Sequence, residues 1–432
     1  AYDQYMATQN ISNTNLADGK PIYWLNGTSD AIYSDVGLFV CLNCNNVTVT
    51  NSSISRAYYG LYFENTSNSY ITNINVSNSD TAIYLASGSN NTITNNVVNN
   101  NEYEGIYLYS TSNNTISNNT VSNNSDAGIS LYADSNSNTI SNNIVNNNNN
   151  GIKLYSNSNN TISNNTVKNN TEGISLSLSS NNVITNNIVI NNSNYGFYLE
   201  YSSDNNTISN NTINNNQYGI YLYFSSSNNL TSNIANNNYN GIWLEQNNFN
   251  ILTNNTASNN NQYGIYLYFS SSNNLTSNIA NNNYNGIWLE QSNFNILTNN
   301  TASNNDHGIY LSSSPNSTLT ANNMTGNKYN LWAYDQYMAT QNISDTNLAE
   351  GKPIYWLNGV SDAVYSDGGL FVCLNCNNVT VANSSITRAY YGVYFENTNN
   401  SYITNINVSD SYIGIYLSSS PNSTLTANNM TG

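Results

Sequence analysis

The sequence has little charge, and most of that charge is negative. Among 432 residues there are only 7 Lys and Arg against 23 Asp and Glu, which gives a formal net charge of -16. Because no basic stripe is present to neutralise phosphates, we expect no nucleic-acid partner. Low charge also removes a usual guard against self-association. Solubility must therefore depend largely on Asn, Ser and Thr, and on any attached sugars.

A long apolar run is also missing, although 38% of the residues are hydrophobic. No segment reaches the ~18 consecutive apolar residues of a membrane helix, so we expect no membrane span. The first residue is Ala rather than Met, and we expect a processed, extracellular chain whose signal peptide has been removed. Glycosylation sequons are frequent, and we expect a few of them to carry glycans; the candidates are Asn10, Asn46, Asn118, Asn164 and Asn378.

What the sequence does contain is a repeat of 22 or 23 residues, marked by the small residue that opens each word of the type "GIYL". Within a repeat this word alternates with period two, and "NTI" and "NTV" add two short β-prone pieces between Asn and Ser turn residues. Three short strands in each coil predict an all-β fold, a right-handed parallel β-helix. The handedness follows the general preference of parallel crossovers. A left-handed β-helix and a disordered Asn-rich tract are the alternatives.

Equivalent residues of successive coils form columns in such a solenoid. Isoleucines such as Ile106, Ile129 and Ile152 are expected to point inward and form the core. A second column contains Asn119, Asn143, Asn165, Asn187 and Asn211. Side-chain amides stacked about 4.8 Å apart can hydrogen-bond along the axis, so we interpret this column as a structural ladder.

Longer repeats lie above the coil. Residues 1–77 recur from Ala333 with an offset of 332, and residues 217–260 recur at 262–305. We therefore predict a full β-helix unit at 1–332, with an entry segment at 1–58 and coils at 59–332. A shortened second unit at 333–432 repeats 1–77 and adds a terminal coil.

The opening segment carries the words "DGKPIYW" and "NCNNVTV", and coils of the type "NNTISNN" and "GIYL" follow. In this order the chain resembles the NosD-like, carbohydrate-binding-and-sugar-hydrolase type of right-handed β-helix domain over essentially its whole length. The resemblance implies the fold more than a reaction. Such domains are abundant in surface proteins of methanogenic archaea, and this chain looks like a cell-surface or sheath component. The copper role in the family name is not supported by one His and four scattered Met, so we expect no metal and no cofactor.

Aromatic residues are the most informative feature, with 37 Tyr in the chain. They recur at the outward position between inward Ile and Leu, which predicts a long aromatic face for assembly or for sugars. The candidates for this face are Tyr107, Tyr198, Tyr221, Trp243, Tyr266, Trp288 and Tyr310. We favour contact with another protein, because low charge and repetition suit lateral assembly.

Catalytic and metal chemistry find less support in the sequence. Glu200, Glu245 and Glu290 follow the outward aromatic word two coils apart, and we interpret them as a solvated acidic face rather than catalytic residues. The only cysteines form two "CLNC" words, Cys41 with Cys44 and Cys373 with Cys376. Disulfides within each word or between chains are favoured in a secreted protein, while a small packed residue and a zinc ligand are the alternatives.

These patterns predict a structural protein without enzymatic activity that polymerises into an extracellular sheath, surface layer or filament. Its main partner is another copy of itself, through lateral and head-to-tail contacts. A carbohydrate-binding adhesin and a glycan lyase or hydrolase are the alternatives. The word "ANNMTG" at Gly326 continues within six residues into the Ala1-type word "AYDQYM", and the same "ANNMTG" stands at Gly432. We therefore expect the end near Gly432 to abut an Ala1-type segment, because an uncapped β-helix exposes strand edges.

Overall fold

The computed structural model describes residue 6 and residues 8–333 and 335–432. The chain divides into two compact units, unit 1 at Ala1–Asn229 and unit 2 at Leu230–Gly432. Strand β27 (Asn229–Thr231) lies at this division. The division falls within the run of similar coils, and the boundary at 332/333 that the long repeat indicates stays a prediction.

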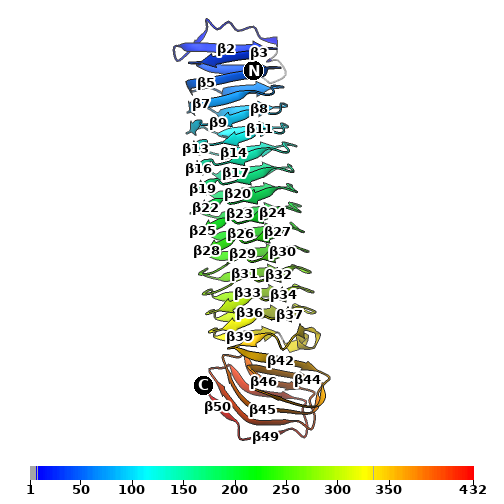
Figure 1. Cartoon of the computed structure of the whole chain (residues 1–432). Coiled ribbons are helices and arrows are strands. Elements are labelled where there is room, and N and C mark those ends of the chain that lie inside the picture. The colour runs from blue at the N-terminus through cyan, green and yellow to red at the C-terminus, as the bar shows by residue number, and fades with distance from the viewer. Residues whose placement is uncertain (1–5, 7, 334) are drawn as a thin grey trace. The chain divides into compact units, whose positions relative to one another are not determined.

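Unit 1 is a parallel β-helix in which successive coils place equivalent strands side by side (Figure 1). One wall holds β1 (Leu16–Ala17), β2 (Lys20–Asn26), β4 (Leu38–Leu42), β6 (Tyr59–Glu64), β8 (Thr81–Ala86), β11 (Ile106–Tyr109), β14 (Ala127–Tyr132), β17 (Asn150–Tyr155), β20 (Glu172–Ser177), β23 (Tyr195–Glu200) and β26 (Tyr218–Tyr223). We call this wall the long-strand face.

The remaining walls of unit 1 are made of shorter strands. They are β3 (Ser29–Ser34), β5 (Asn45–Ser55), β7 (Tyr70–Ser77), β9 (Thr92–Thr94), β10 (Val97–Asn99), β12 (Thr115–Ser117), β13 (Thr120–Ser122), β15 (Thr139–Ser141), β16 (Ile144–Asn146), β18 (Thr161–Ser163), β19 (Thr166–Lys168), β21 (Val183–Thr185), β22 (Ile188–Ile190), β24 (Thr207–Ser209) and β25 (Thr212–Asn214). The pairings are parallel, and the register aligns Ile140 with Ile162 and Val145 with Val167. The predicted parallel β-helix is therefore confirmed.

The corners between short strands explain the abundance of Asn. Asn142, Asn164 and Asn186 each adopt a left-handed backbone, with φ of 57°, 56° and 57°. Asn tolerates this region better than other residues with a side chain, because its short polar group hydrogen-bonds locally. The residue that follows each of these turns points inward and is buried. Each "SNN" word thus provides both the bend and the next rung of an internal ladder.

The predicted amide ladder is confirmed in unit 1. The Asn143 side chain donates from Nδ2 to Oδ1 of Asn165 over 3.0 Å, and Asn165 donates in the same way to Asn187. Each Oδ1 also accepts the backbone N–H of the preceding rung, as in the 2.9 Å bond from Asn143 N to Asn165. A buried amide is costly unless its donors and acceptors are paired, and the ladder pairs them. The apolar columns fill the remaining interior, with Ile129, Ile152 and Ile174 fully buried in register.

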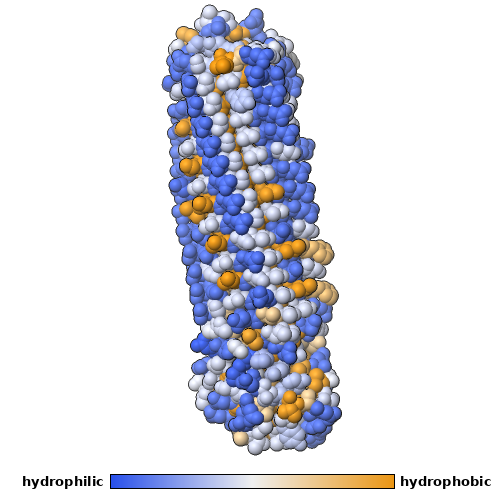
Figure 2. All heavy atoms as spheres, viewed as in Figure 1, coloured by the Kyte–Doolittle hydropathy of each residue, from blue (hydrophilic) through white to orange (hydrophobic). Residues whose placement is uncertain are grey.

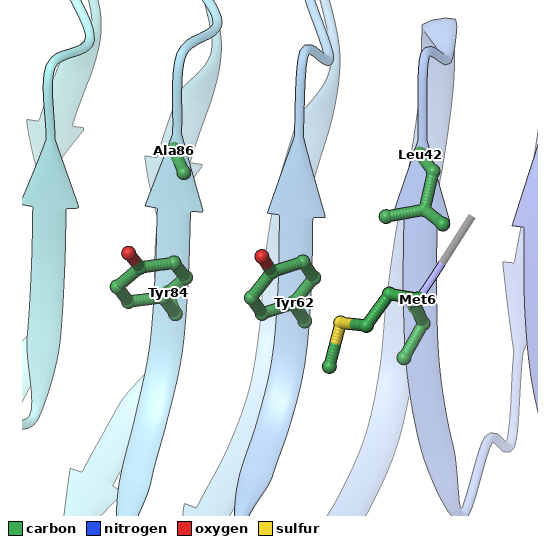
Figure 3. Close-up of a cluster of buried hydrophobic side chains, with 6 residues drawn as sticks. Met6, Leu42, Tyr62, Tyr84 and Ala86 are labelled. Atoms are coloured by element: carbon green, nitrogen blue, oxygen red, sulfur yellow. The ribbon is translucent and has the colours of Figure 1, made fainter. Parts of the chain in front are cut away.

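A small apolar cluster lies on the outward side of the first long strands of unit 1 (Figure 3). Met6 packs beside Leu42, and the rings of Tyr62 and Tyr84 lie on neighbouring strands with centroids 5.1 Å apart. The indole of Trp24 donates from Nε1 to the carbonyl oxygen of Met6 over 3.1 Å. This hydrogen bond ties the entry segment to the first long strand.

Unit 2 begins with coils of the same kind. Its strands are β28 (Ile234–Asn236), β29 (Asn240–Glu245), β30 (Ile251–Thr253), β31 (Tyr263–Tyr268), β32 (Asn274–Thr276), β33 (Asn285–Glu290), β34 (Ile296–Thr298), β35 (Thr301–Ser303), β36 (His307–Ser312), β37 (Thr318–Thr320), β38 (Asn323–Thr325) and β39 (Tyr329–Ala333). The 3-10 helix η2 (Asp335–Thr340) then starts the second copy of the entry segment.

The second copy contains β40 (Asn342–Ile343), β41 (Leu348–Ala349), β42 (Lys352–Asn358), β43 (Ser361–Ser366), β44 (Leu370–Leu374), β45 (Asn377–Thr387), β46 (Tyr391–Glu396), β47 (Tyr402–Ser409), β48 (Ile413–Ser418), β49 (Thr424–Thr426) and β50 (Asn429–Thr431). Its entry segment repeats the first one closely. Trp356 donates from Nε1 to the Met338 carbonyl over 3.0 Å, as Trp24 does to Met6. In unit 2, β40 and β41 also pair in parallel with β37 and β38 of the preceding coil.

Candidate interaction surfaces

The predicted aromatic face is more enclosed than the sequence indicated. Tyr266 and Tyr310 are only 6% and 5% exposed, and the other candidates are half-buried. In unit 1 the rings of Tyr198 and Tyr221 stack with centroids 5.5 Å apart at an interplanar angle of 8°. In unit 2 Trp288 meets Tyr310 edge-on at 4.2 Å. The rings cover each other because adjacent parallel strands bring equivalent side chains into contact along the axis.

Burial has an electrostatic consequence on this face. It raises the pKa values of Tyr107, Tyr198 and Tyr266, and the neighbouring carboxylates Glu104, Glu200 and Glu290 raise them further. The hydroxyl of Tyr266 donates to Oε2 of Glu290 over 2.8 Å. These phenols therefore stay neutral, and that of Tyr266 is a hydrogen-bond donor.

In unit 1 the aromatic column is interrupted by a hollow. Ser130, Lys153 and Ser175 stand in consecutive coils where the aromatic ring stands elsewhere. A cavity of about 270 Å³ opens there, lined by Asn150, Lys153, Leu154, Tyr155, Glu172, Ser175, Ser177 and Glu200. Because Ser stands at the outward position in place of an aromatic residue, the column has a gap there, and we call this hollow the notch.

The notch contains two carboxylates, and an amide hydrogen-bonds to one of them. Asn150 Nδ2 donates to Glu172 Oε2 over 2.6 Å and to Ser175 Oγ over 3.2 Å. Burial is the main cause of a raised pKa of Glu172, and the charge of Glu200 adds to the increase, while Ser175, Lys153 and Asn150 oppose it. Such a group keeps its proton at a higher pH than an exposed carboxyl group. Lys153 and Asn150 supply donors and the carboxyl groups supply acceptors, so the notch suits a hydroxyl-rich ligand.

A second apolar feature was missed by the sequence analysis. In unit 1, Leu178, Tyr201 and Phe224 occupy the turn that follows the long-strand face in three consecutive coils, and all three are exposed. Their backbones are left-handed, with φ of 51°, 47° and 47°. Earlier coils place Ser110, Ala133 and Ser156 at this position. We call Leu178, Tyr201 and Phe224 the turn ridge.

The backbone of the turn ridge is unfavourable for its side chains. A left-handed backbone costs about 1–2 kcal/mol for a residue with a Cβ, and bulky residues adopt it least often. Because these side chains are exposed, they gain little from burial in return. The same left-handed turn recurs in coil after coil, for example at Ser110 and Ser156, so the bend itself is structural, and the bulky exposed side chain is what sets these three coils apart. The sequence did contain a signal for this feature, since the words "LEY" and "LYF" end in an aromatic residue where other coils have Ser. That the position is a left-handed turn is known only from the structure.

The turn ridge is continuous with the aromatic column. Tyr223 contacts Phe224 with centroids 4.5 Å apart and Tyr201 at 5.7 Å, and it lies 6.2 Å from Tyr221. In unit 2, Phe269 is exposed at the equivalent left-handed turn, and Phe249 and Phe294 are exposed at the following left-handed corner of their coils. Figure 2 shows apolar side chains recurring among hydrophilic ones on the side in view.

The remaining predicted residues take simpler places. A disulfide joins Cys41 to Cys44, and another joins Cys373 to Cys376, with Cα atoms 5.9 Å apart in each pair. All four cysteines are buried, so none is placed to link another chain. The sequon residues Asn10, Asn46, Asn118, Asn164 and Asn378 are all exposed. A glycan at any of them would project away from the core.

The acidic positions do not gather into a catalytic group on the long-strand face of unit 2. Glu245 and Glu290 flank Tyr268 in the strand register, so an aromatic residue separates them. His307 Nδ1 lies 2.9 Å from Oδ1 of Asn285, and burial lowers the pKa of this imidazole. Its hydrogen bond and ring contacts are those of a packed side chain.

The described residues do not fit a copper site. The chain has one His and four Met, and Met324 and Met338 are buried in packing roles. The cysteines are paired with each other rather than free. In the part of the chain that the structure describes, no three His, Cys, Asp or Glu side chains gather at distances that suit a metal ion. Soft copper ligands are thus not assembled here.

Two family models match the chain. A family model described as "Periplasmic copper-binding protein (NosD)" matches residues 132–235, 201–359 and 358–432. A model described as "Right handed beta helix region" matches residues 10–152, in agreement with the predicted handedness. No curated protein shows significant similarity to the sequence. Among the residues described, no helix has the length and apolar character needed to cross a membrane.

Solved structures resemble the chain at low identity. The A-module of mannuronan C-5 epimerase AlgE4 from Azotobacter vinelandii is 12% identical, covers 88% of this chain and 90% of its own, and has a TM-score of 0.40. The Dettilon tailspike protein is 14% identical over 70% of this chain and 63% of its own, with a TM-score of 0.45. DFA-IIIase from Arthrobacter chlorophenolicus A6 in complex with GF2 is 9% identical over 70% and 88%, with a TM-score of 0.40.

These neighbours correct one expectation from the sequence. The chain was expected to have no enzymatic activity, yet the solved structures that resemble it include epimerases and a DFA-IIIase, so that exclusion is wrong. At such identities and TM-scores no activity of theirs is transferred to this chain. The family model does cover well over half of the sequence, and the chain belongs to the NosD family of β-helix proteins.

Proposed function

We propose that the chain is a structural protein that assembles with copies of itself into an extracellular layer, sheath or filament on the cell surface. The turn ridge is the observation that carries this proposal. It exposes three bulky apolar side chains on adjacent coils at a cost in backbone energy. A second copy is the favoured partner because every copy presents the same repeated apolar side chains. The net charge of -16 opposes this contact, so association is expected to strengthen as salt screens the repulsion between copies.

A location outside the cytoplasm is part of the proposal. Two buried disulfides favour an oxidising compartment. The family model is described as periplasmic, and exposed sequons are compatible with glycosylation at the surface. The archaeal sheath is the setting that the sequence resemblance favours.

The lateral contact is tested by a double variant, Tyr201→Ser and Phe224→Ser, which restores the residue type of Ser110 and Ser156. We expect the variant to lose side-by-side association while the monomer unfolds no more easily than the wild type. Light scattering and negative-stain microscopy measure the association, and circular dichroism measures the fold.

Tyr103→Ser provides the matched control, because Tyr103 is an exposed aromatic residue of unit 1 outside the turn ridge. Association that persists in the double variant, or that is lost equally in the control, contradicts the role of the ridge. A wild-type protein that stays a dispersed monomer at high concentration contradicts the proposed function itself.

The notch favours a second function, the binding of a neutral saccharide. Tyr155 supplies an aromatic wall, and Asn150, Glu172 and Lys153 supply hydrogen-bonding groups beside it. Uronic acids are disfavoured because Glu172 and Glu200 share the same hollow. A glycan array with Tyr155→Ala tests this function, and Tyr109→Ala, an exposed tyrosine that does not line the hollow, is its control. Cleaved products on incubation with a bound glycan would extend the function to a hydrolase or lyase.

A further inference from the structure

A hollow in unit 2 brings together charged side chains from successive coils. Its volume is about 520 Å³. It lies beside the left-handed corners that follow β35, β38, β45 and β47. We call it the corner hollow, and the lining residues that matter here are Asn304, Asp306, Gly326, Lys328, Arg388 and Asp410.

The corner hollow exists because Gly326 stands where the preceding coil has Asn304. Both residues have a left-handed backbone, with φ of 67° and 56°. A side-chain carbon placed on Gly326 would collide with Oδ1 of Asn304 and would lie 3.7 Å from Nη1 of Arg388. The guanidinium of Arg388 therefore lies beside space that the usual Asn side chain would fill. The N–H of Gly326 is already used, since it donates to Oε1 of Glu350 over 2.7 Å.

The chain returns to this corner after the second entry segment. The backbone N–H of Asn330 donates to the carbonyl oxygen of Arg388 over 2.8 Å. The rings of Trp332 and Tyr390 stack next to this bond, with centroids 3.9 Å apart at an interplanar angle of 8°. Arg388 is thus held against the coil of Gly326 by its backbone and by its neighbours, which leaves its guanidinium free to face the hollow.

The two cations of the corner hollow stand out in a chain with only 7 Lys and Arg. Three of the seven are held in ion pairs with aspartates, namely Lys20, Arg56 and Lys352. Among the described residues, neither Lys328 nor Arg388 has an ion pair or a side-chain hydrogen bond, although Lys328 Nζ lies 5.3 Å from the ring centroid of Tyr329. Their N–H donors are therefore available to a ligand.

The same corners of unit 1 provide an internal comparison. They form a groove of about 440 Å³ in which Asn78, Asn100 and Asn123 hold the left-handed positions. The charged residues of that groove are Asp80 and Glu102, and no Lys or Arg of the described chain lines it. Positive charge is therefore not a general property of the corners, and it is concentrated where Gly326 leaves space.

We propose that the corner hollow binds a hexuronate residue of an acidic polysaccharide. Arg388 pairs with the planar carboxylate through its fork of N–H groups, and Lys328 adds a second positive charge. Asp306 and Asp410 accept hydrogen bonds from ring hydroxyls, and the amide of Asn304 adds a donor and an acceptor. This site is separate from the turn ridge and does not depend on self-assembly.

The two carboxylates of the corner hollow also restrict the charge of the ligand. A dianion such as a phosphate monoester meets the repulsion of Asp306 and Asp410, whereas a single carboxylate flanked by hydroxyls places its charge on Arg388 and its hydroxyls on the aspartates. An apolar carboxylate is disfavoured because the lining is made of charged and amide side chains. The corner hollow thus selects an acidic sugar, while the notch of unit 1 suits a neutral one.

Calorimetric titration of the full chain with oligogalacturonate and with its methyl ester tests the proposal. All titrations use the Tyr155→Ala background, so that the notch does not contribute. We expect the ester to bind about 10- to 100-fold more weakly, because it lacks the charge that Arg388 recognises. Added salt should weaken the binding of the acid, and inorganic phosphate should not displace it. An ester that binds as tightly as the acid, or displacement by phosphate, overturns the proposal.

Two variants locate the binding in the hollow. Arg388→Gln should weaken oligogalacturonate about 10- to 100-fold and leave the ester unchanged. Gly326→Asn restores the usual corner residue, which tolerates the left-handed backbone, and should abolish binding by filling the space. Both variants should keep the circular dichroism spectrum of the parent chain.

Lys168→Gln is the matched control, because it removes one positive charge from β19 of unit 1, outside the corner hollow. We expect it to bind oligogalacturonate as the parent chain does. If Lys168→Gln weakens binding as much as Arg388→Gln, the attraction is a general effect of net charge and the site is refuted. Undiminished binding in Gly326→Asn refutes it as well.

Discussion

The two copies of the coil at 308–326 and 414–432 form an internal comparison within unit 2, because their sequences are the same and their surroundings differ. In the first copy, Asn322 donates its Nδ2 hydrogen bond to the amide oxygen of the following entry segment. In the second copy, Asn428 keeps the inward bond to the Ile403 carbonyl over 2.9 Å but is only half-buried. The difference teaches that the coil folds from its own residues and from the coil before it, while its burial depends on the segment that comes next.

The largest expected effect concerns Leu319 and its equivalent Leu425. Leu319→Ala should lower the local free energy of opening by about 3 kcal/mol, because it leaves a cavity in a fully covered site. Leu425→Ala should change it by less than about 0.5 kcal/mol, because half-exposed side chains contribute little. Hydrogen exchange of the amides in β37 and β49 measures the two values. Equal effects would contradict the difference in burial.

The polar rung should give a smaller difference. Asn347→Ala leaves the Asn322 amide and the Leu319 carbonyl without their partner, and we expect a loss of about 2 kcal/mol in the same exchange measurement. Asn15→Ala, the matched change in the uncovered entry segment, should cost less than about 0.5 kcal/mol in the monomer. A monomer equally sensitive to both changes would show that Asn347 does not act as a rung.

The smallest expected effect concerns the acidic residue that ends each entry segment, Glu350 in the second copy and Asp18 in the first. Glu350→Asp shortens the side chain that accepts the Gly326 N–H, and we expect a loss of about 1 kcal/mol. Its equivalent Asp18 instead meets Arg56 and Ser55 at 3.2 and 2.8 Å on the surface, so Asp18→Glu should change stability by less than about 0.5 kcal/mol. Denaturant unfolding of both variants beside the wild type measures the two changes. A Glu350→Asp variant as stable as the wild type would show that the hydrogen bond from Gly326 to Glu350 contributes nothing to stability.

Much of the fold could be predicted from residues that recur at equivalent positions of successive coils. The inward Ile positions and the amide ladder through Asn143 and Asn165 follow from a fixed repeat length, because a parallel β-helix places equivalent residues in register. Pairing within each "CLNC" word was one of several alternatives in the sequence. Two features depended on the backbone instead. The left-handed turn under Tyr201 and Phe224 and the hollow over Ser175 come from the path of the chain, which residue types alone do not fix.

The predicted aromatic face illustrates why exposure was harder to foresee than orientation. Period two correctly places Tyr266 and Tyr310 on the outward side of their strands, but it says nothing about neighbours along the axis. Stacking on adjacent rings leaves these two side chains almost covered. The apolar groups that solvent does reach lie both in turns, as Tyr201 and Phe224 do, and at outward positions of the short strands, as Ile144 and Ile188 do.

The sequence by itself determined the solenoid, its period and its core, because short-range alternation and Asn turns repeat without interruption and each coil needs only its neighbours. Tertiary structure decided which surfaces are left available. Met324 and Met430 hold the same place in the same word, and Met324 is buried because β41 packs against it, whereas Met430 has no such strand beside it among the described residues and is 52% exposed. The physical reason is that burial is a property of what lies within a few ångströms in space, which an identical stretch of sequence cannot specify.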